Sequence, residues 1–205
     1  REMPNLRHAL DLAMAAGAVD EAVGFADRIA RFLDNFGRWR EREAMMEEVE
    51  RCTLHVTRSR ADEGGDGLTK AEFLLMMRRG EALLQAGRSA ESERVWREIL
   101  GRIEAGAAYD AAYDQAVAFR HIGLAVAAQG RPAQAIGYHQ RALAGFERIG
   151  SREEGVGSKQ AKQMAGYVHA DLADNLQAVG QFDDAQNHYE ISLKIARQNE
   201  DHRSA

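Results

Sequence analysis

The chain has 205 residues and a net charge of −5, and its composition already excludes several classes of protein. Apolar residues make up 45% and charged residues 29%, which is typical of a soluble folded protein and not of a disordered or membrane-spanning one. Ala supplies 36 residues, Pro only 2, and aromatic residues only 7%. This composition favours an almost entirely helical chain and argues against a Rossmann domain, a β-sandwich or a barrel.

The charged and sulfur-containing residues limit the partners and the compartment. Of the 27 basic residues 23 are Arg, but the chain is acidic overall, which disfavours nucleic acid as a partner. The single Cys52 excludes an internal disulfide framework and favours a reducing, cytoplasmic environment. The sequence contains neither a run of eighteen apolar residues nor a signal-peptide pattern, so we expect no membrane partner. Because the chain begins at Arg1, we expect it to be a fragment of a longer protein.

Apolar residues recur at helical spacing along almost the whole chain, and glycines divide the pattern into segments. Gly is expected to end a helix because it accepts the left-handed backbone of a tight turn. The turn glycines are Gly17, Gly37, Gly87, Gly130 and Gly180. Two longer breaks, 62–67 and 150–158, are predicted to be exposed loops. The predicted helices cover about nine segments: 5–16, 19–35, 39–58, 69–86, 89–105, 108–129, 132–149, 158–179 and 182–199.

The same glycines reveal an internal repeat. In the last two units Ala185 and Tyr189 follow Gly180 at the spacing at which Ala135 and His139 follow Gly130. Each unit is predicted to be an antiparallel helix pair, with small residues where the two backbones approach closely. One pair cannot bury its apolar face alone, so successive pairs must stack. We therefore predict one repeat domain over 1–205, with units 19–60, 68–105, 108–149 and 158–199 preceded by an extra helix, 5–16.

This small–aromatic pattern resembles that of the tetratricopeptide-repeat (TPR) family. The match is closest over 167–199 and 117–149, partial over 74–105 and loose over 24–58. The resemblance implies an all-α, right-handed superhelix of helix pairs. The usual period is 34 residues, whereas the last four turn glycines are 50, 43 and 50 residues apart, so the helices and two loops must be longer.

The N-terminal segment resembles the start of the repeat region in STAND-class signalling ATPases, which include regulators of the NB-ARC type. The residues that carry this resemblance are 4–13 together with Ala16 and Gly17. It implies that the chain is the sensor arm of a larger bacterial signalling protein, whose ATPase domain lies outside this sequence.

Several patterns that suggest catalysis or metal binding fail on closer inspection. Segment 155–159 has the wrong residue order for a phosphate-binding loop, and 62–67 lacks two of the ligands that an EF-hand needs. Cys52 and His55 share a helix face, but no residue orients the imidazole. His139 and His169 occupy packing positions of the repeat, so we expect satisfied imidazoles between helices. Core packing is expected for Trp96, and Trp39 occupies a position where the family's aromatic residue packs. We predict no enzyme activity, metal or cofactor.

The concave face is the predicted binding site, because in the TPR family the first helix of each pair lines the inner groove. Carried over position by position, the candidate ligand-contacting residues are Arg28, Arg31, Arg78, Glu81, Arg120, His121, Asp171 and Asp174. In this alignment Arg28, Arg78 and Arg120 occupy one equivalent position in three units, and an acid follows in the last. Such a row of arginines is suited to clamping a carboxylate or phosphate, unless each arginine pairs with a nearby acid.

These observations favour a non-catalytic module that binds a protein or peptide segment in the concave groove. Two alternatives remain open. One is a self-associating structural scaffold, and the other is the peptide or small-molecule receptor domain of a helical-repeat regulator. Segment 182–199 carries Ile191, Leu193 and Ile195 among polar residues, so we expect that a further helix follows it.

Overall fold

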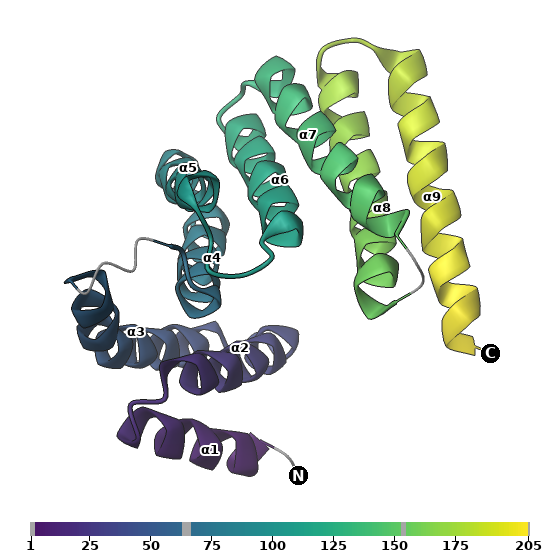
Figure 1. Ribbon diagram of the computed structural model, residues 1–205. Coiled ribbons are helices and arrows are strands. Elements are labelled where there is room, and N and C mark those ends of the chain that lie inside the picture. Colours follow the sequence, from purple (N-terminus) through teal and green to yellow (C-terminus); the bar gives the residue numbers. More distant parts are fainter. Residues whose placement is uncertain (1–2, 63–66, 153–154, 205) are drawn as a thin grey trace. The chain divides into compact units, whose positions relative to one another are not determined.

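Helices account for nearly all of the structure, a computed structural model that describes residues 3–62, 67–152 and 155–204 (Figure 1). The described residues form no strand, and their one isolated β-bridge joins Leu68 and Ala107. The helices are α1 (Met3–Ala15), α2 (Val19–Asn35), α3 (Trp39–Asp62), α4 (Lys70–Gln85), α5 (Ser89–Ala105), α6 (Ala112–Ala128), α7 (Pro132–Gly150), α8 (Val156–Ala178) and α9 (Phe182–Ser204).

Each helix corresponds to one predicted segment, with differences at the ends. The largest difference is at the end of α9, which was expected at residue 199 and lies at Ser204. Another is the start of α6, which was expected at residue 108 and lies at Ala112. The late start of α6 follows from the bridge: the Leu68 N–H donates to the Gly106 carbonyl at 3.2 Å, and the Ala108 N–H donates to the Leu68 carbonyl at 3.1 Å. Gly106 has a φ of +140°, which L side chains rarely adopt. The segment is therefore held by the bridge to Leu68 and bends before α6 begins.

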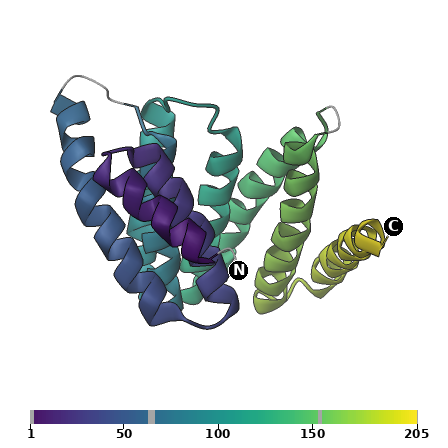
Figure 2. The same ribbon diagram turned by 90° about the horizontal axis from the view of Figure 1, so that it is seen from below.

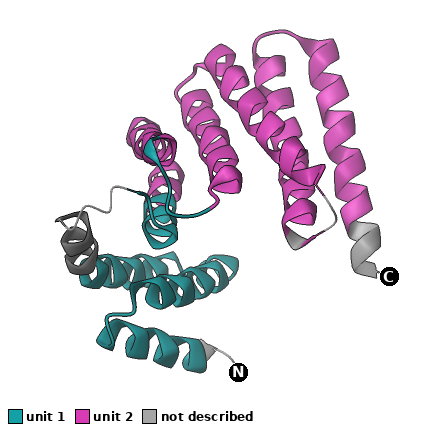
Figure 3. Cartoon of the chain, viewed as in Figure 1, with its two compact units in different colours: residues 1–78, 105–109 teal, residues 79–104, 110–205 magenta. Residues whose placement is uncertain are grey.

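The chain divides into two compact units (Figure 3). Unit 1 comprises residues 1–78 and 105–109, and unit 2 comprises residues 79–104 and 110–205. In unit 1, α2 packs against both α1 and α3. The predicted extra helix α1 buries Leu10 and Ala13 in a core that also holds Ile29, Met45 and Val49. In unit 2, α6, α7, α8 and α9 follow one another side by side, and each packs on the next (Figures 1 and 2).

The five predicted turn glycines all end helices with the same hydrogen-bond pattern. At Gly130, φ is +75°, the Gly130 N–H donates to the Ala127 carbonyl, and the Arg131 N–H donates to the Val126 carbonyl. Gly17, Gly37, Gly87 and Gly180 have φ between +65° and +83° and repeat both bonds. This is the Schellman ending, which satisfies carbonyls at the helix end and requires a residue that tolerates positive φ. The predicted role of these glycines is confirmed.

The residues that follow the turns also repeat. The Arg38 side chain donates to Glu41, and Arg88 donates to Glu91 at the same positions one repeat later. Arg131 continues the pattern by donating to the side-chain oxygen of Gln134. All three pairs are exposed and add little stability. Their recurrence nevertheless shows that the units after Gly37, Gly87 and Gly130 share one local geometry.

Two further glycines are the positions where paired helices touch most closely. A Cβ on Gly80 would lie 2.6 Å from Trp96 Nε1, and a Cβ on Gly123 would lie 2.6 Å from His139 Nε2. Both bulky residues are fully buried, and each lies nine positions after its turn glycine. The expected core role of Trp96 is therefore confirmed. The expectation for Trp39 is wrong: it is 64% exposed, because it begins its helix directly after the turn instead of lying on the face toward α2.

Replacing Gly123 by Ala tests this close approach. The added Cβ must displace the buried His139 ring, so we expect Gly123→Ala to lower the free energy of unfolding by about 1–3 kcal/mol. Gly137→Ala is the matched control, because Gly137 lies inside α7 with open space around it. The control should be neutral or stabilising by up to about 1 kcal/mol through helix propensity. Urea denaturation followed by circular dichroism measures both, and equal effects of the two substitutions would contradict this packing.

Candidate functional site

The predicted groove residues lie in both compact units, and each group has its own surroundings. Arg28, Arg31 and Arg78 belong to unit 1. Unit 2 holds the other five, which are Glu81, Arg120, His121, Asp171 and Asp174.

In unit 1 a buried carboxylate engages two of the three predicted arginines. Asp27 Oδ1 accepts hydrogen bonds from Arg78 Nε at 3.0 Å and Nη2 at 2.6 Å. The other oxygen, Oδ2, lies 2.7 Å from Arg31 Nη2. Arg28 is exposed and has no ion pair in the described part of the chain. Two of the arginines expected to bind an anionic ligand, Arg31 and Arg78, are thus already paired with the carboxylate of Asp27.

Unit 2 repeats this arrangement with the charges exchanged. Arg120 Nε on α6 donates to Asp171 Oδ2 on α8 at 2.6 Å, and both side chains are mostly buried. The Arg120 guanidinium also lies 5.8 Å from the centre of the exposed Tyr167 ring. Residues 27 and 78 are 51 positions apart, as are residues 120 and 171. One ion pair therefore ties α2 to α4 within unit 1, and its counterpart ties α6 to α8 within unit 2.

His121 is a packing residue in the structure. Its ring stacks on Trp96 with 4.2 Å between the centres and an 8° angle, and Nε2 lies 3.8 Å from Glu81 Oε1. Burial, reinforced by the neighbouring Arg120 and His139, lowers the pKa of His121 to about 3. The imidazole is therefore neutral at pH 7 and cannot serve as a cation for an acidic ligand.

The other two histidines of interest differ in their hydrogen bonding. His169 Nδ1 on α8 lies 2.7 Å from His188 Nδ1 on α9, which confirms an imidazole bonded between helices. His139 lies 3.9 Å from Asp171, and neither of its ring nitrogens has a hydrogen-bond partner in the described structure. Burial lowers the pKa of both His139 and His169. The expected satisfied imidazole is thus found at His169 only.

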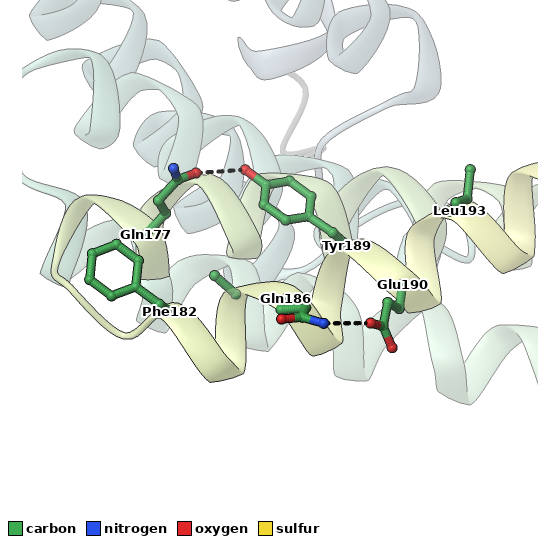
Figure 4. A pocket seen from close by; sticks show the side chains of 7 residues that line it. Gln177, Phe182, Gln186, Tyr189, Glu190 and Leu193 are labelled. Carbon is green, nitrogen blue, oxygen red and sulfur yellow. Dashed lines mark hydrogen bonds between the residues drawn. The ribbon is translucent and has the colours of Figure 1, made fainter.

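Asp174 connects the predicted residues to a hollow that was not predicted from the sequence. Its carboxylate accepts a hydrogen bond from the Tyr189 hydroxyl, which raises the pKa of Tyr189. The Tyr189 hydroxyl also lies 3.2 Å from the side-chain oxygen of Gln177 (Figure 4). The hollow has a volume of about 310 Å³ and lies on the α8–α9 pair. Its lining comprises Gln177, Phe182, Ala185, Gln186, Tyr189, Glu190 and Leu193.

The lining side chains are unusually exposed for apolar residues. Phe182 is 66% exposed, Leu193 51% and Tyr189 38%. Aligning Gly180 with Gly130 gives their counterparts in the preceding helix pair: Tyr189 corresponds to His139, and Leu193 corresponds to Leu143. His139 is fully buried and Leu143 is half-buried, and α7 is packed against α8. The hollow is therefore the surface that the next helix covers one pair earlier.

The other patterns considered in the sequence can be compared with the described residues. They contain no group of three or more His, Cys, Asp or Glu side chains that is arranged to hold a metal ion. The Ser158 hydroxyl donates to the Gly150 carbonyl at 2.9 Å, so it helps join α7 to α8. None of the helices in the described ranges combines the length and the apolarity that crossing a bilayer requires. The side chain of His55 and loop residues 63–66 lie outside the described part of the chain.

Comparison with solved structures places the fold among TPR-like repeat proteins. BtubC (BKLC) from P. vanneervenii matches with a TM-score of 0.68 and 16% identity over 97% of this chain and 76% of that one. A putative kinesin light chain from Podosopora anserina with nearly identical TPR-like repeats gives 0.52 and 14%, covering 97% and 96%. MamA from Desulfovibrio magneticus RS-1 gives 0.52 and 14%, covering 97% of each chain.

These likenesses confirm the predicted fold class, an all-α arrangement of TPR-like helix pairs. At such low identity they define the fold and not the activity. No family model matches the sequence, and no curated protein matches it.

The buried ion pair of unit 1 gives a stability prediction. Asp27→Asn removes the carboxylate that accepts two hydrogen bonds from the mostly buried Arg78 guanidinium, so we expect a loss of about 2–3 kcal/mol in the free energy of unfolding. Asp11→Asn is the control, because Asp11 pairs with Arg7 on the exposed surface of α1. That change should cost less than about 1 kcal/mol. If urea denaturation gives the same small loss for both, the Asp27 pair contributes nothing beyond an ordinary surface contact.

The lowered pKa of His121 gives a pH prediction. The unfolded chain takes up a proton on this residue near pH 6.5, whereas the folded chain resists protonation down to about pH 3. Stability should therefore fall as the pH drops below 6.5, by up to about 1.4 kcal/mol per pH unit for this residue. His121→Phe keeps a ring against Trp96 but cannot titrate, so its unfolding free energy should fall less steeply between pH 6.5 and 5. Identical slopes for variant and wild type would contradict the burial of a neutral His121.

Proposed function

We propose that the chain is a non-catalytic module that binds an amphipathic helix of a protein partner on the hollow of the α8–α9 pair. The observation that carries the proposal is the contrast between equivalent residues: beside α8, His139 is fully buried and Leu143 is half-buried, whereas Tyr189 and Leu193 are exposed. The fold itself thus indicates the shape of the occupant, because α8 covers the same surface on α7.

The lining determines which helix fits. Phe182, Tyr189 and Leu193 offer apolar area along α9, so the partner needs apolar residues on one face at helical spacing. α8 meets its neighbours through mainly small buried residues such as Ala161, Ala165 and Val168, and a partner with a similar face would approach α9 closely. Burying the aromatic side chains supplies most of the favourable free energy, since aromatic anchors dominate interfaces of this kind.

Charge adds a preference for a basic rim on the partner. Asp183 and Asp184 lie exposed in the first turn of α9, and exposed Asp174 borders the hollow through Tyr189. Lys or Arg beside the apolar stripe of the partner would meet these carboxylates. Such contacts at a rim act mainly on the association rate and on selectivity.

The finer predictions made from the sequence belong to the same proposal. A groove formed by the inner residues remains a proposed second contact surface, with exposed Arg28 and Asp174 better suited than the paired Arg78 and Arg120. Four repeat units preceded by α1, a cytoplasmic location and a role as the sensor arm of a bacterial ATPase are also proposed. The ATPase idea rests on residues 4–17 alone and is tested by the gene: an upstream reading frame without a nucleotide-binding loop would contradict it.

A selection experiment tests the binding proposal. A phage-displayed library of helical peptides is selected against the chain, and binding of the selected peptides is measured by fluorescence anisotropy. We expect peptides with apolar residues at helical spacing, and we expect Leu193→Asp to weaken their binding at least tenfold. Ile191→Asp is the matched control, since Ile191 is exposed on α9 but does not line the hollow. It should change binding less than twofold.

Two other outcomes would reject the proposal. If no peptide is selected, or if Leu193→Asp and Ile191→Asp weaken binding equally, the hollow is not the binding surface. If light scattering shows a dimer of wild type that Leu193→Asp converts to a monomer, the face serves self-association. The structural scaffold would then replace the binding module.

A further inference from the structure

A second hollow, on the α6–α7 pair, has a different chemical character. It has a volume of about 370 Å³ and lies entirely within unit 2. Small residues form much of its lining, among them Ala116 of α6 and Ala144 and Gly145 of α7. Phe119, Arg141 and Arg148 also line it. It shares no lining residue with the hollow on α8–α9.

The small residues keep this hollow open. A Cβ on Gly145 would lie 2.8 Å from the Ala116 Cβ, so α6 and α7 are in direct contact there. Because no long side chain of either helix rises from Ala116, Ala144 or Gly145, the space above them stays available to a partner. The hollow can therefore accommodate a side chain of moderate size that enters between α6 and α7.

The two arginines of the hollow are positioned for an external anion. Neither Arg141 nor Arg148 has an ion pair within the described ranges, whereas Arg78, Arg97 and Arg120 do. The Arg141 guanidinium lies 5.8 Å from the Phe119 ring centre and 5.9 Å from that of Tyr138. Such cation–π contacts orient the guanidinium without neutralising its charge. Both guanidinium groups are thus left without an ion-pair partner in the described ranges, in a chain whose net charge is −5.

We propose that this hollow binds an acidic helix of a protein partner, two carboxylates of which pair with Arg141 and Arg148. The two arginines are seven residues apart on α7, which places them on one face about 10.5 Å apart along the axis. A helix lying along α7 with carboxylates seven residues apart has the same spacing. An apolar side chain midway between those carboxylates enters the hollow above Ala144 and Gly145. Arginine pairs carboxylates bidentately, which makes the contact selective for acidic side chains.

This inference is independent of the function proposed for α8–α9, since it rests on other residues and calls for an acidic partner. A basic-rimmed helix on one hollow and an acidic helix on the other would give the chain two sites for protein partners within unit 2.

Synthetic helical peptides test the proposal on the full chain. The probe is a labelled Ala-based peptide with two Glu seven residues apart and one Leu between them on the same face, titrated at low ionic strength. We expect saturable binding that Arg141→Gln combined with Arg148→Gln weakens at least tenfold. Arg94→Gln, at an exposed position of α5 outside the hollow, is the control and should change binding less than twofold. Unchanged circular dichroism verifies that the double variant is folded.

Further arms separate this site from nonspecific charge attraction and from a simple anion site. A peptide with the two Glu on opposite faces should bind at least tenfold more weakly, and equal binding would overturn the proposal in favour of nonspecific attraction. Millimolar inorganic phosphate should not displace the peptide, and full displacement would overturn the proposal by showing a simple anion site. Absence of binding, or equal binding by the double variant, would also overturn it. Leu193→Asp should leave this peptide's affinity unchanged, so the proposal for α8–α9 can fail separately.

Discussion

An amphipathic helix pair leaves one apolar face uncovered, and the remaining structure of unit 2 follows from that constraint. One face of α6–α7 is covered by α8, which packs on α7, brings Asp171 to Arg120 and lies beside His139, whose ring also packs against Gly123 of α6. On α8–α9 the equivalent positions, Tyr189 and Leu193, lie exposed, and no helix among the described residues covers them. Stability and the binding proposed for α8–α9 thus rest on the same type of surface, since the contact that α8 makes with α6–α7 is the contact that a partner helix would make with α8–α9.

The charged residues of the first helices play a structural part in this arrangement. Asp27–Arg78 in unit 1 and Arg120–Asp171 in unit 2 use equivalent positions with opposite polarity. Buried pairs of this kind fix which helix positions can meet, because a shift of register would leave a charge unpaired. The side chains available for external ligands are therefore those left out of these pairs, such as Arg28 in unit 1 and Arg141 and Arg148 in unit 2.

The sequence identified what local chemistry decides. Three features depend on residues that are close together in the chain, and all three were predicted: the turn glycines, the helix segments and the burial of Trp96 in the core. The partner of Arg78 is 51 residues away and was not predicted, since long-range contacts depend on how successive helices are rotated. Counting back from the turn glycines shows a separate error in the predicted alignment of the arginines. Arg120 lies ten residues before its turn glycine, like Asp27, whereas Arg28 and Arg78 lie nine before theirs, so the three arginines do not share one position. The α8–α9 hollow was not predicted because Tyr189 and Leu193 have the same character as core residues, and the sequence pattern alone does not distinguish them from their more buried counterparts His139 and Leu143.

Amide hydrogen exchange tests most directly the claim that α9 has an uncovered face. The measurement compares the central amides of α7, which packs on α6 and α8, with those of α9, which packs on α8, in a preparation shown to be monomeric. The account predicts that α9 exchanges at least tenfold faster than α7 in the free chain, and that an added helical ligand slows α9 toward the rate of α7. Equal protection of α7 and α9 in the free monomer would contradict it.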